Sequence, residues 1–233
     1  FGIMPGLGSI IGTGDTQRAI RLRDEINSFI WLTATTLGAS ILIWNRVFIG
    51  LWVGAAHYSG PLPNLLIVVA AMQLALIRSD GNIIDLTLRL NQKVLLGLLS
   101  VTASIVAAGI MVGYFQLGVV GLCFGIMAGR LIISIGYPTL ISRFLGISLF
   151  SQLNQALRPV IITILFFSIA IGLDHFAAFA FTPGIMGWIK FIISAGATGI
   201  LMLAASFYAG LSGDQRRNML RRVRAALTTT ESL

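Results

Sequence analysis

The sequence predicts an all-α, polytopic integral membrane protein: a helical bundle with six complete transmembrane helices and a partial one at the N-terminus. Of the 233 residues, 56% are hydrophobic and only 10% are charged, and the mean hydropathy is +0.91. Soluble domains carry roughly 25% charged residues, so this chain cannot cover its surface with charge and lipid must be its solvent. The second observation is a series of apolar runs, and the third is that none of them alternates as β-barrel strands do.

The N-terminal stretch FGIMPGLGSIIG is apolar but too short to cross a bilayer, which takes about 20 residues. It lacks the basic region and the cleavage site of a signal peptide. Because the chain begins with Phe1, we interpret this stretch as the end of a helix whose start is missing, and the chain as the C-terminal part of a longer protein. The polar stretch 13–25 follows, where Gly14-Asp15 is a turn and cap signal that predicts a short amphipathic helix.

Six longer apolar runs are each expected to span the membrane as a helix. They are apolar on all sides, as lipid-exposed or buried membrane helices are. Two of the breaks predict specific helix ends: RSDGN at 78–82 predicts a turn, and Pro138 predicts an end near Tyr137, since proline disfavours helix in the residue before it. The runs occupy about 28–53, 62–78, 93–114, 117–140, 157–174 and 186–210, and the other breaks are HYSGPLPN at 57–64, GYFQLG at 113–118 and FTPG at 181–184.

Basic residues fall in alternate loops, which sets the orientation. Of the 16 Lys and Arg residues, 13 lie on one side of the predicted membrane. The positive-inside rule places that side, with the C-terminal tail, in the cytoplasm. The net charge of +8 is then accounted for by topology and by contact with anionic lipid headgroups, so no nucleic-acid partner is expected. The 13 residues are Arg18, Arg21, Arg23, Arg78, Arg89, Lys93, Arg143, Arg158, Arg216, Arg217, Arg221, Arg222 and Arg224.

Three basic residues remain, and two of them are candidates for substrate binding. Lys190 opens the last span, where it can snorkel to the outer interface. Arg130 lies well inside its span, and Arg46 lies in the apolar run IWNRVFIGLWVG. A charge in a spanning segment is costly and usually faces a bundle interior or a watery cavity on a substrate path. The alternative is snorkelling, outward for Arg46 and inward for Arg130.

Few acidic residues could neutralise these arginines. Asp80 and Asp85 fall in a predicted cytoplasmic loop, Asp174 falls at the outer end of the fifth span, and no span has a carboxylate in its middle. That pattern argues against a proton- or sodium-coupled drug antiporter. An unpaired arginine instead suits an anionic substrate, because guanidinium matches phosphate oxygens in a bidentate fork. Arg46 and Arg130 are therefore predicted to bind a phosphate-bearing substrate.

No motif indicates catalysis, a cofactor or a metal site. His57 and His175 are both on the outer side without a Ser/His/Asp arrangement, and Cys123 has no cysteine partner, so it is interpreted as a packing residue. Glycines at 118, 121, 125 and 129 recur at spacings of three and four, which predicts a small-residue face for close helix contact. We therefore predict a protein that is not an enzyme.

Three segments carry a family resemblance. PGLGSIIGTGDTQRAIRLRDE resembles the segment after the second helix of the C-terminal lobe in Wzx-type polysaccharide flippases of the multidrug/oligosaccharidyl-lipid/polysaccharide (MOP) exporter superfamily. VFIGLWVG resembles a recurrent Leu-Trp motif of the same proteins, and GYFQLGVVGLCFGIMAGR resembles their short turn before the sixth helix of the lobe. Order and spacing agree across about residues 1–145, and the last two spans resemble an extra pair that some members carry.

The resemblance implies three parts: a C-terminal flippase lobe without its first helix (1–145), an extra helix pair (146–210) and a basic cytoplasmic tail (211–233). With the missing N-terminal lobe of the same protein, it would enclose a central cavity in the bacterial inner membrane. The implied activity is flipping of a lipid-linked, undecaprenyl-pyrophosphate oligosaccharide for O-antigen or teichoic acid export, by alternating access and without a cofactor. Members often line the cavity with basic residues, which fits Arg46 and Arg130 without a matching motif.

Two other readings stay open. Within the superfamily, the chain could belong to a lipid II flippase or a multidrug antiporter. Outside transport, it could be a membrane scaffold or a subunit of an integral membrane transferase. A polar or cationic face shared by several helices would favour a transporter. Clustered His, Asp or Glu at one membrane interface would favour a transferase, and the sequence lacks such a cluster.

Overall fold

The computed structural model describes residues 16–86, 90–177 and 184–221, apart from 212, 214 and 218. These residues form helices and no strands, and six of the helices are long and apolar enough to cross a membrane, which confirms the predicted all-α polytopic class. The expected N-terminal partial helix lies outside the described residues. The elements are α2 (Thr16–Trp52), the 3₁₀-helix η1 (Ala55–His57), α3 (Pro61–Leu86), α4 (Leu90–Gly109), the π-helical turn η2 (Ile110–Tyr114), α5 (Gly118–Leu145), α6 (Leu149–Ala177) and α7 (Ile185–Gly210).

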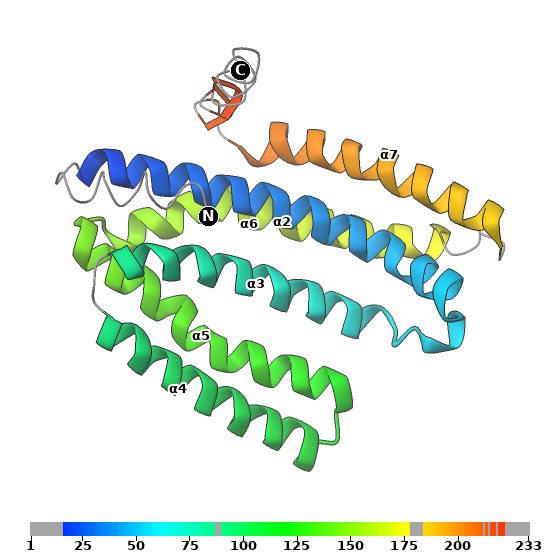
Figure 1. Cartoon of the computed structure of the whole chain (residues 1–233), viewed down its shortest axis with the longest axis horizontal. Helices are drawn as coiled ribbons and strands as arrows, with labels where there is room; N and C mark the ends of the chain where they lie inside the picture. The colour runs from blue at the N-terminus through cyan, green and yellow to red at the C-terminus, as the bar shows by residue number, and fades with distance from the viewer. Residues whose placement is uncertain are drawn as a thin grey trace, which may run out of the picture.

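The long helices lie roughly parallel in a flattened bundle (Figure 1). In the order α7, α2, α3, α5 and α4 they lie side by side, and α6 lies behind α2. Helix α2 packs against α3, α6 and α7, and α5 packs against α3 and α4. Two apolar cores follow from this arrangement: one lies between α2, α3 and α6 around Leu42 and Phe167, and the other lies between α2, α3 and α5 around Ile84 and Ile141.

Basic residues gather at one end of this bundle, which we call the basic end. It is the end where α2, α4 and α6 begin and where α3, α5 and α7 finish, opposite η1 and η2 (Figure 1). The sequence predicted that the loops rich in Lys and Arg lie on one side. This is confirmed for the described residues, whose basic loops meet at one end of the bundle. Arg89, Arg222 and Arg224 lie outside the described residues, and the basic end carries Arg18, Arg21, Arg23, Arg78, Lys93, Arg143, Arg158, Arg216, Arg217 and Arg221.

The predicted turn at 78–82 is wrong, because α3 continues through Asp80-Gly81 to Leu86. Contacts with other helices hold this segment. Asp80 pairs with Arg23 of α2, and the carbonyl of Gly81 accepts a hydrogen bond from Lys93 Nζ of α4 at 3.2 Å. A glycine inside a helix costs only about 1 kcal/mol relative to alanine, so these tertiary contacts outweigh the local turn signal.

The predicted helix end near Tyr137 is also wrong, because α5 runs through Pro138 to Leu145. Tyr137 and Ile141 are buried in the second core, which stabilises the continued helix. Membrane helices tolerate internal proline. Gln152 Nε2 of α6 also donates to the Pro138 carbonyl at 3.4 Å, which ties α6 to this part of α5. The helix ends instead at Gly146, which adopts a left-handed conformation with φ of 68°.

The amphipathic segment that the sequence predicts before the first span is not a separate helix. It is continuous with that span in α2, which is 37 residues long. The small-residue face predicted on α5 is confirmed at Gly125 and Gly129: a Cβ at Gly125 would overlap the backbone of Ala108 on α4, and a Cβ at Gly129 would overlap Ser104. It does not extend to Gly118, where a Cβ would meet nothing within 4 Å. The absence of side chains at Gly125 and Gly129 therefore sets how closely α4 and α5 approach.

Candidate functional site

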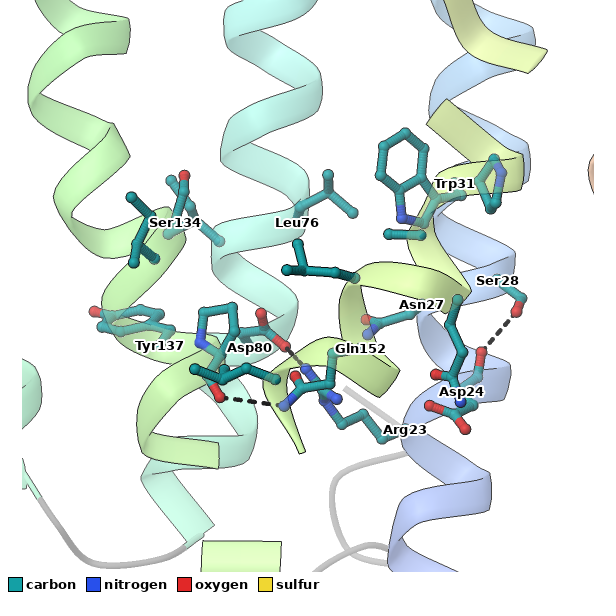
Figure 2. Close-up of a pocket in the computed structure, with 18 of the residues that line it drawn as sticks. Arg23, Asp24, Asn27, Ser28, Trp31, Leu76, Asp80, Ser134, Tyr137 and Gln152 are labelled. Atoms are coloured by element: carbon teal, nitrogen blue, oxygen red, sulfur yellow. Dashed lines mark hydrogen bonds and ion pairs between the residues drawn. The ribbon is translucent and has the colours of Figure 1, made fainter. Parts of the chain in front are cut away.

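A partly open cavity of about 450 Å³ lies toward the basic end, lined mainly by α2, α3, α5 and α6 (Figure 2). This volume falls within the roughly 300–1,000 Å³ of typical small-molecule pockets. Its polar and charged lining residues are Arg23, Asp24, Asn27 and Ser28 of α2, Gln73 and Asp80 of α3, Ser134 and Thr139 of α5, Gln152 and Gln155 of α6, and Gln215 beyond α7.

Helical periodicity explains why these residues share a cavity. Residues three, four or seven positions apart lie on the same face of a helix. Accordingly α2 presents Arg23, Asn27 and Trp31 to the cavity, and α3 presents Gln73 and Asp80. Each helix contributes one such stripe. Apolar residues elsewhere on the same helices face the two cores or the exterior.

A buried ion pair joins α2 to α3 in the cavity wall. Arg23 Nη2 lies 3.1 Å from Asp80 Oδ1, and their side chains are 5% and 14% exposed. One turn further along α2, Asn27 Oδ1 accepts a hydrogen bond from Ser79 Oγ at 3.0 Å. The two contacts fix the register of α2 against α3 at the basic end. They leave Asp24 as a third ionisable side chain of the lining, and within the described structure it has no ion pair.

Two glutamines in the cavity lining link neighbouring helices by hydrogen bonds. Gln73 Nε2 donates to Ser134 Oγ at 3.2 Å and to the Met127 carbonyl at 3.3 Å, which links α3 to α5. Gln152 links α6 to α5 through its bond to Pro138. The Oε1 atoms of both glutamines, and Nε of Arg23, are buried without a hydrogen-bond partner among the described residues. Such atoms are costly unless they are satisfied by another group. Because they are fully buried, they do not offer exposed hydrogen-bonding groups to the cavity.

Arg130 lies on α5 one turn beyond Ser134, on the side away from the basic end, and does not line the cavity. Its Nη1 donates to the Ala70 carbonyl of α3 at 3.0 Å, and the side chain is partly buried. Within the described structure it makes no ion pair. The sequence-based expectation that this arginine has no acidic partner therefore agrees with its observed contacts.

Arg46 lies near the other end of α2, and the view that it has no acidic partner is wrong. Its Nη1 is 4.0 Å from Asp174 Oδ2 of α6, and its guanidinium carbon lies 5.9 Å from the Tyr58 ring centroid. Burial and the Asp174 carboxylate raise the pKa of Tyr58, and the Arg46 charge opposes that rise. Arg46 is 43% exposed while Asp174 is 4% exposed. The arginine thus compensates a buried acid at this end of the bundle.

The structure does not bring the two predicted substrate-binding arginines together. Arg46 contacts α6 and Tyr58, Arg130 contacts α3, and neither lines the cavity. Sequence reasoning missed the residues that do line it, notably Arg23, Asp24 and Asp80. One sequence signal could have found part of the site: Gln73 and Asp80 are seven residues apart, which places them on the same face of a continuous helix. The turn predicted at 78–82 separated Asp80 from that helix. The assignment of Arg46 and Arg130 to substrate binding stays a prediction.

Among the described residues, the other titratable and nucleophilic groups form no metal cluster. Cys123 is buried, and within the described residues no three His, Cys, Asp or Glu side chains gather as metal ligands. Comparisons of the chain with known protein families, with curated proteins and with solved structures find no match.

Proposed function

We propose that this chain is part of a membrane transporter that flips a lipid-linked, undecaprenyl-pyrophosphate oligosaccharide across the bacterial inner membrane. The observation that carries the proposal is the uncompensated charge of Arg130 in the middle of a membrane-spanning helix. Arg130 lies about 18 Å from the start of α5 and about 22 Å from its end, at 1.5 Å per residue. In a bilayer centred on α5, Arg130 would lie far from both headgroup regions, which disfavours snorkelling.

The contacts of Arg130 leave it able to bind an anion. One backbone carbonyl occupies Nη1, and no carboxylate neutralises the guanidinium within the described structure. Intramembrane charges of this kind usually mark a substrate or ion path. The free N–H groups match the oxygens of a phosphate or pyrophosphate group, which is the charged part of the proposed substrate.

The position of Arg130 beside the cavity supports a transport path. Gln73 and Ser134 line the cavity and hydrogen-bond to each other one turn from Arg130. A polar layer therefore extends along the α3–α5 contact from the cavity to Arg130. Helix α6, one of the proposed extra pair, also lines the cavity, so this pair would be part of the transport unit.

The proposed transporter also requires contact with a lipid bilayer and a second lobe. Most large apolar side chains of α4 and α7 are exposed, as expected for lipid contact. In the proposed orientation the basic end and the C-terminal tail face the cytoplasm. The N-terminal lobe of the same protein would complete the path, as in the flippases that residues 1–145 resemble.

The proposal is tested in a strain whose surface polysaccharide depends on the full-length protein. Arg130→Gln should reduce exported polysaccharide about tenfold or more at equal membrane abundance, and Arg130→Lys should retain part of the activity because it keeps the charge. Arg158→Gln is a matched control, since Arg158 lies at the basic end and its Nε donates to the Ala209 carbonyl. Arg46→Gln tests the second predicted residue in the same assay.

Normal polysaccharide in the Arg130→Gln strain would refute the role of this arginine. A second assay separates transport from biosynthesis: purified full-length protein in vesicles should move a fluorescent lipid-linked oligosaccharide to the opposite leaflet. Absence of any such movement by the wild-type protein would refute the flippase proposal itself.

A further inference from the structure

Gln73 joins α3 to α5 at two points that lie on either side of Arg130. Its Nε2 donates to the Met127 carbonyl at 3.3 Å and to Ser134 Oγ at 3.2 Å. Met127 precedes Arg130 by three residues and Ser134 follows it by four, so all three lie on one face of α5. The Gln73 amide is therefore held against the stretch of α5 that carries the arginine.

Arg130 makes the return contact, from α5 to α3. Its Nη1 donates to the carbonyl of Ala70, which lies three residues before Gln73 and on the same face of α3. The two side chains thus cross one helix contact in opposite directions. An arginine side chain has many rotamers, and its surroundings must select one of them. The two bonds made by Gln73 fix α3 against α5 at the level where Arg130 has to reach Ala70.

The amide at position 73 also affects the charge balance around Arg130. Arg23 and Arg46 each have a carboxylate on a neighbouring helix, at 3.1 Å and 4.0 Å. Beside Arg130, the neighbouring helix supplies Gln73 instead. Glutamine has nearly the size and shape of glutamate but no charge. It fills the contact and leaves the guanidinium without an ion pair within the described structure.

We propose that Gln73 is the positioning residue of the Arg130 site, and that its lack of charge gives this site its preference for an anion. The amide holds α3 and α5 together on both sides of the arginine, so that the remaining N–H groups of the guanidinium are oriented for ligand oxygens. This inference rests on the proposed function, in which Arg130 binds the phosphate or pyrophosphate group of the substrate. The positioning role can be measured without any substrate.

A double-mutant cycle tests the positioning role. Thermal unfolding is measured for the purified full-length protein in mild detergent, with Gln73→Leu, with Arg130→Gln and with both. Gln73→Leu keeps a similar side-chain size and removes both hydrogen bonds, so it should lower the melting temperature by about 4–8 °C. The double variant should melt close to the less stable single variant, because Arg130 loses its oriented contact once Gln73 is gone. Additive losses would overturn the positioning role.

Gln152→Leu, combined with Arg130→Gln in the same way, is the matched control. Gln152 also lines the cavity and also joins two helices, but it lies on α6 and donates to the Pro138 carbonyl at 3.4 Å. Its loss should therefore add to that of Arg130→Gln. Equal coupling in the two cycles would indicate a general loosening of the bundle, and it would also overturn the positioning role.

Gln73→Glu tests the role of charge, because it places a carboxylate beside Arg130 with little change in shape. Its melting temperature should fall further when Arg130→Gln is added, since the new carboxylate then stays buried without a counter-ion. In the polysaccharide assay, Gln73→Glu should reduce export about tenfold or more at equal membrane abundance, because the ion pair occupies the guanidinium. A merely structural role would not predict lost export in a variant that remains folded.

The export results separate this inference from the proposed function. Normal export by Gln73→Glu, together with reduced export by Arg130→Gln, would overturn the role of charge at position 73 and leave the proposed function intact. Normal export by both variants would refute the transport role of Arg130 and, with it, the anion preference. The melting temperatures decide the positioning role in either case.

Discussion

The Arg23–Asp80 pair gives the sharpest quantitative test of how this bundle is held together at the basic end. At 3.1 Å, and with an effective dielectric constant of about 20, the attraction between the two charges is about 5 kcal/mol before desolvation is subtracted. Removal of one partner from a buried pair typically costs about 3–5 kcal/mol, because the other charge remains buried and unpaired. Replacement of both partners by apolar residues of similar size is often close to neutral.

A double-mutant cycle with Arg23→Met and Asp80→Leu follows directly. We expect each single variant to lose about 3–5 kcal/mol of unfolding free energy, and the double variant to lose less than either one. Unfolding by denaturing detergent, monitored with the full-length chain in mild detergent, gives the four free energies. The control cycle uses Lys93→Met and Asp85→Leu, whose side chains are 27% and 42% exposed, so its coupling energy should be only about 0.2–1 kcal/mol. Additive losses in the Arg23–Asp80 cycle would refute the buried-pair account.

Three further predictions concern the helix contact, the Arg46 pair and Tyr58. Gly125→Ala should lower the unfolding free energy by about 1–3 kcal/mol, because its methyl group would overlap the Ala108 backbone; Gly97→Ala on α4, where a Cβ meets nothing within 4 Å, should be neutral or stabilising in the same measurement. Arg46→Gln should lower stability by less than Arg23→Met does, because Arg46 is 43% exposed and 4.0 Å from Asp174, although it leaves that buried carboxylate without this charge partner. A loss as large as that of Arg23→Met would contradict this ranking. Asp174→Asn should lower the pKa of Tyr58, since the Asp174 carboxylate helps to raise it, and phenolate absorbance during an alkaline titration measures the shift. The phenol's contribution to stability is present below its ordinary pKa and is lost as the pH rises through the raised value, because the unfolded chain ionises first.

The sequence predicted the membrane helices well, because their signal is local. Each span is an uninterrupted apolar run, and the alternation of basic loops depends only on counting those runs. The two errors at helix ends have a common cause. The segments around Asp80 and Pro138 carry local turn or helix-breaking signals, but contacts with other helices keep them helical. Asp80 pairs with Arg23, and Tyr137 and Ile141 are buried in the core between α2, α3 and α5.

The site was less predictable, because it is assembled from four helices. Arg130 could be found from the sequence, since a charge deep inside an apolar run is a local anomaly. The partner of Arg46 could not, since Asp174 reaches it only through the packing of α6 against α2. The cavity residues Asp24 and Gln152 have ordinary polar neighbours in the sequence, and only the arrangement of the helices shows that they face a common space.

Arg23, Arg46 and Arg130 all lie within membrane-spanning helices, and they differ in what compensates their charge. Arg23 has a buried carboxylate at 3.1 Å, and Arg46 has a carboxylate at 4.0 Å near the bundle end. Both charges are balanced by the fold itself and leave little binding energy for a substrate. Among the described residues the polar partner of Arg130 is one backbone carbonyl, so in the proposed transporter it is the arginine whose charge remains available to an anionic ligand.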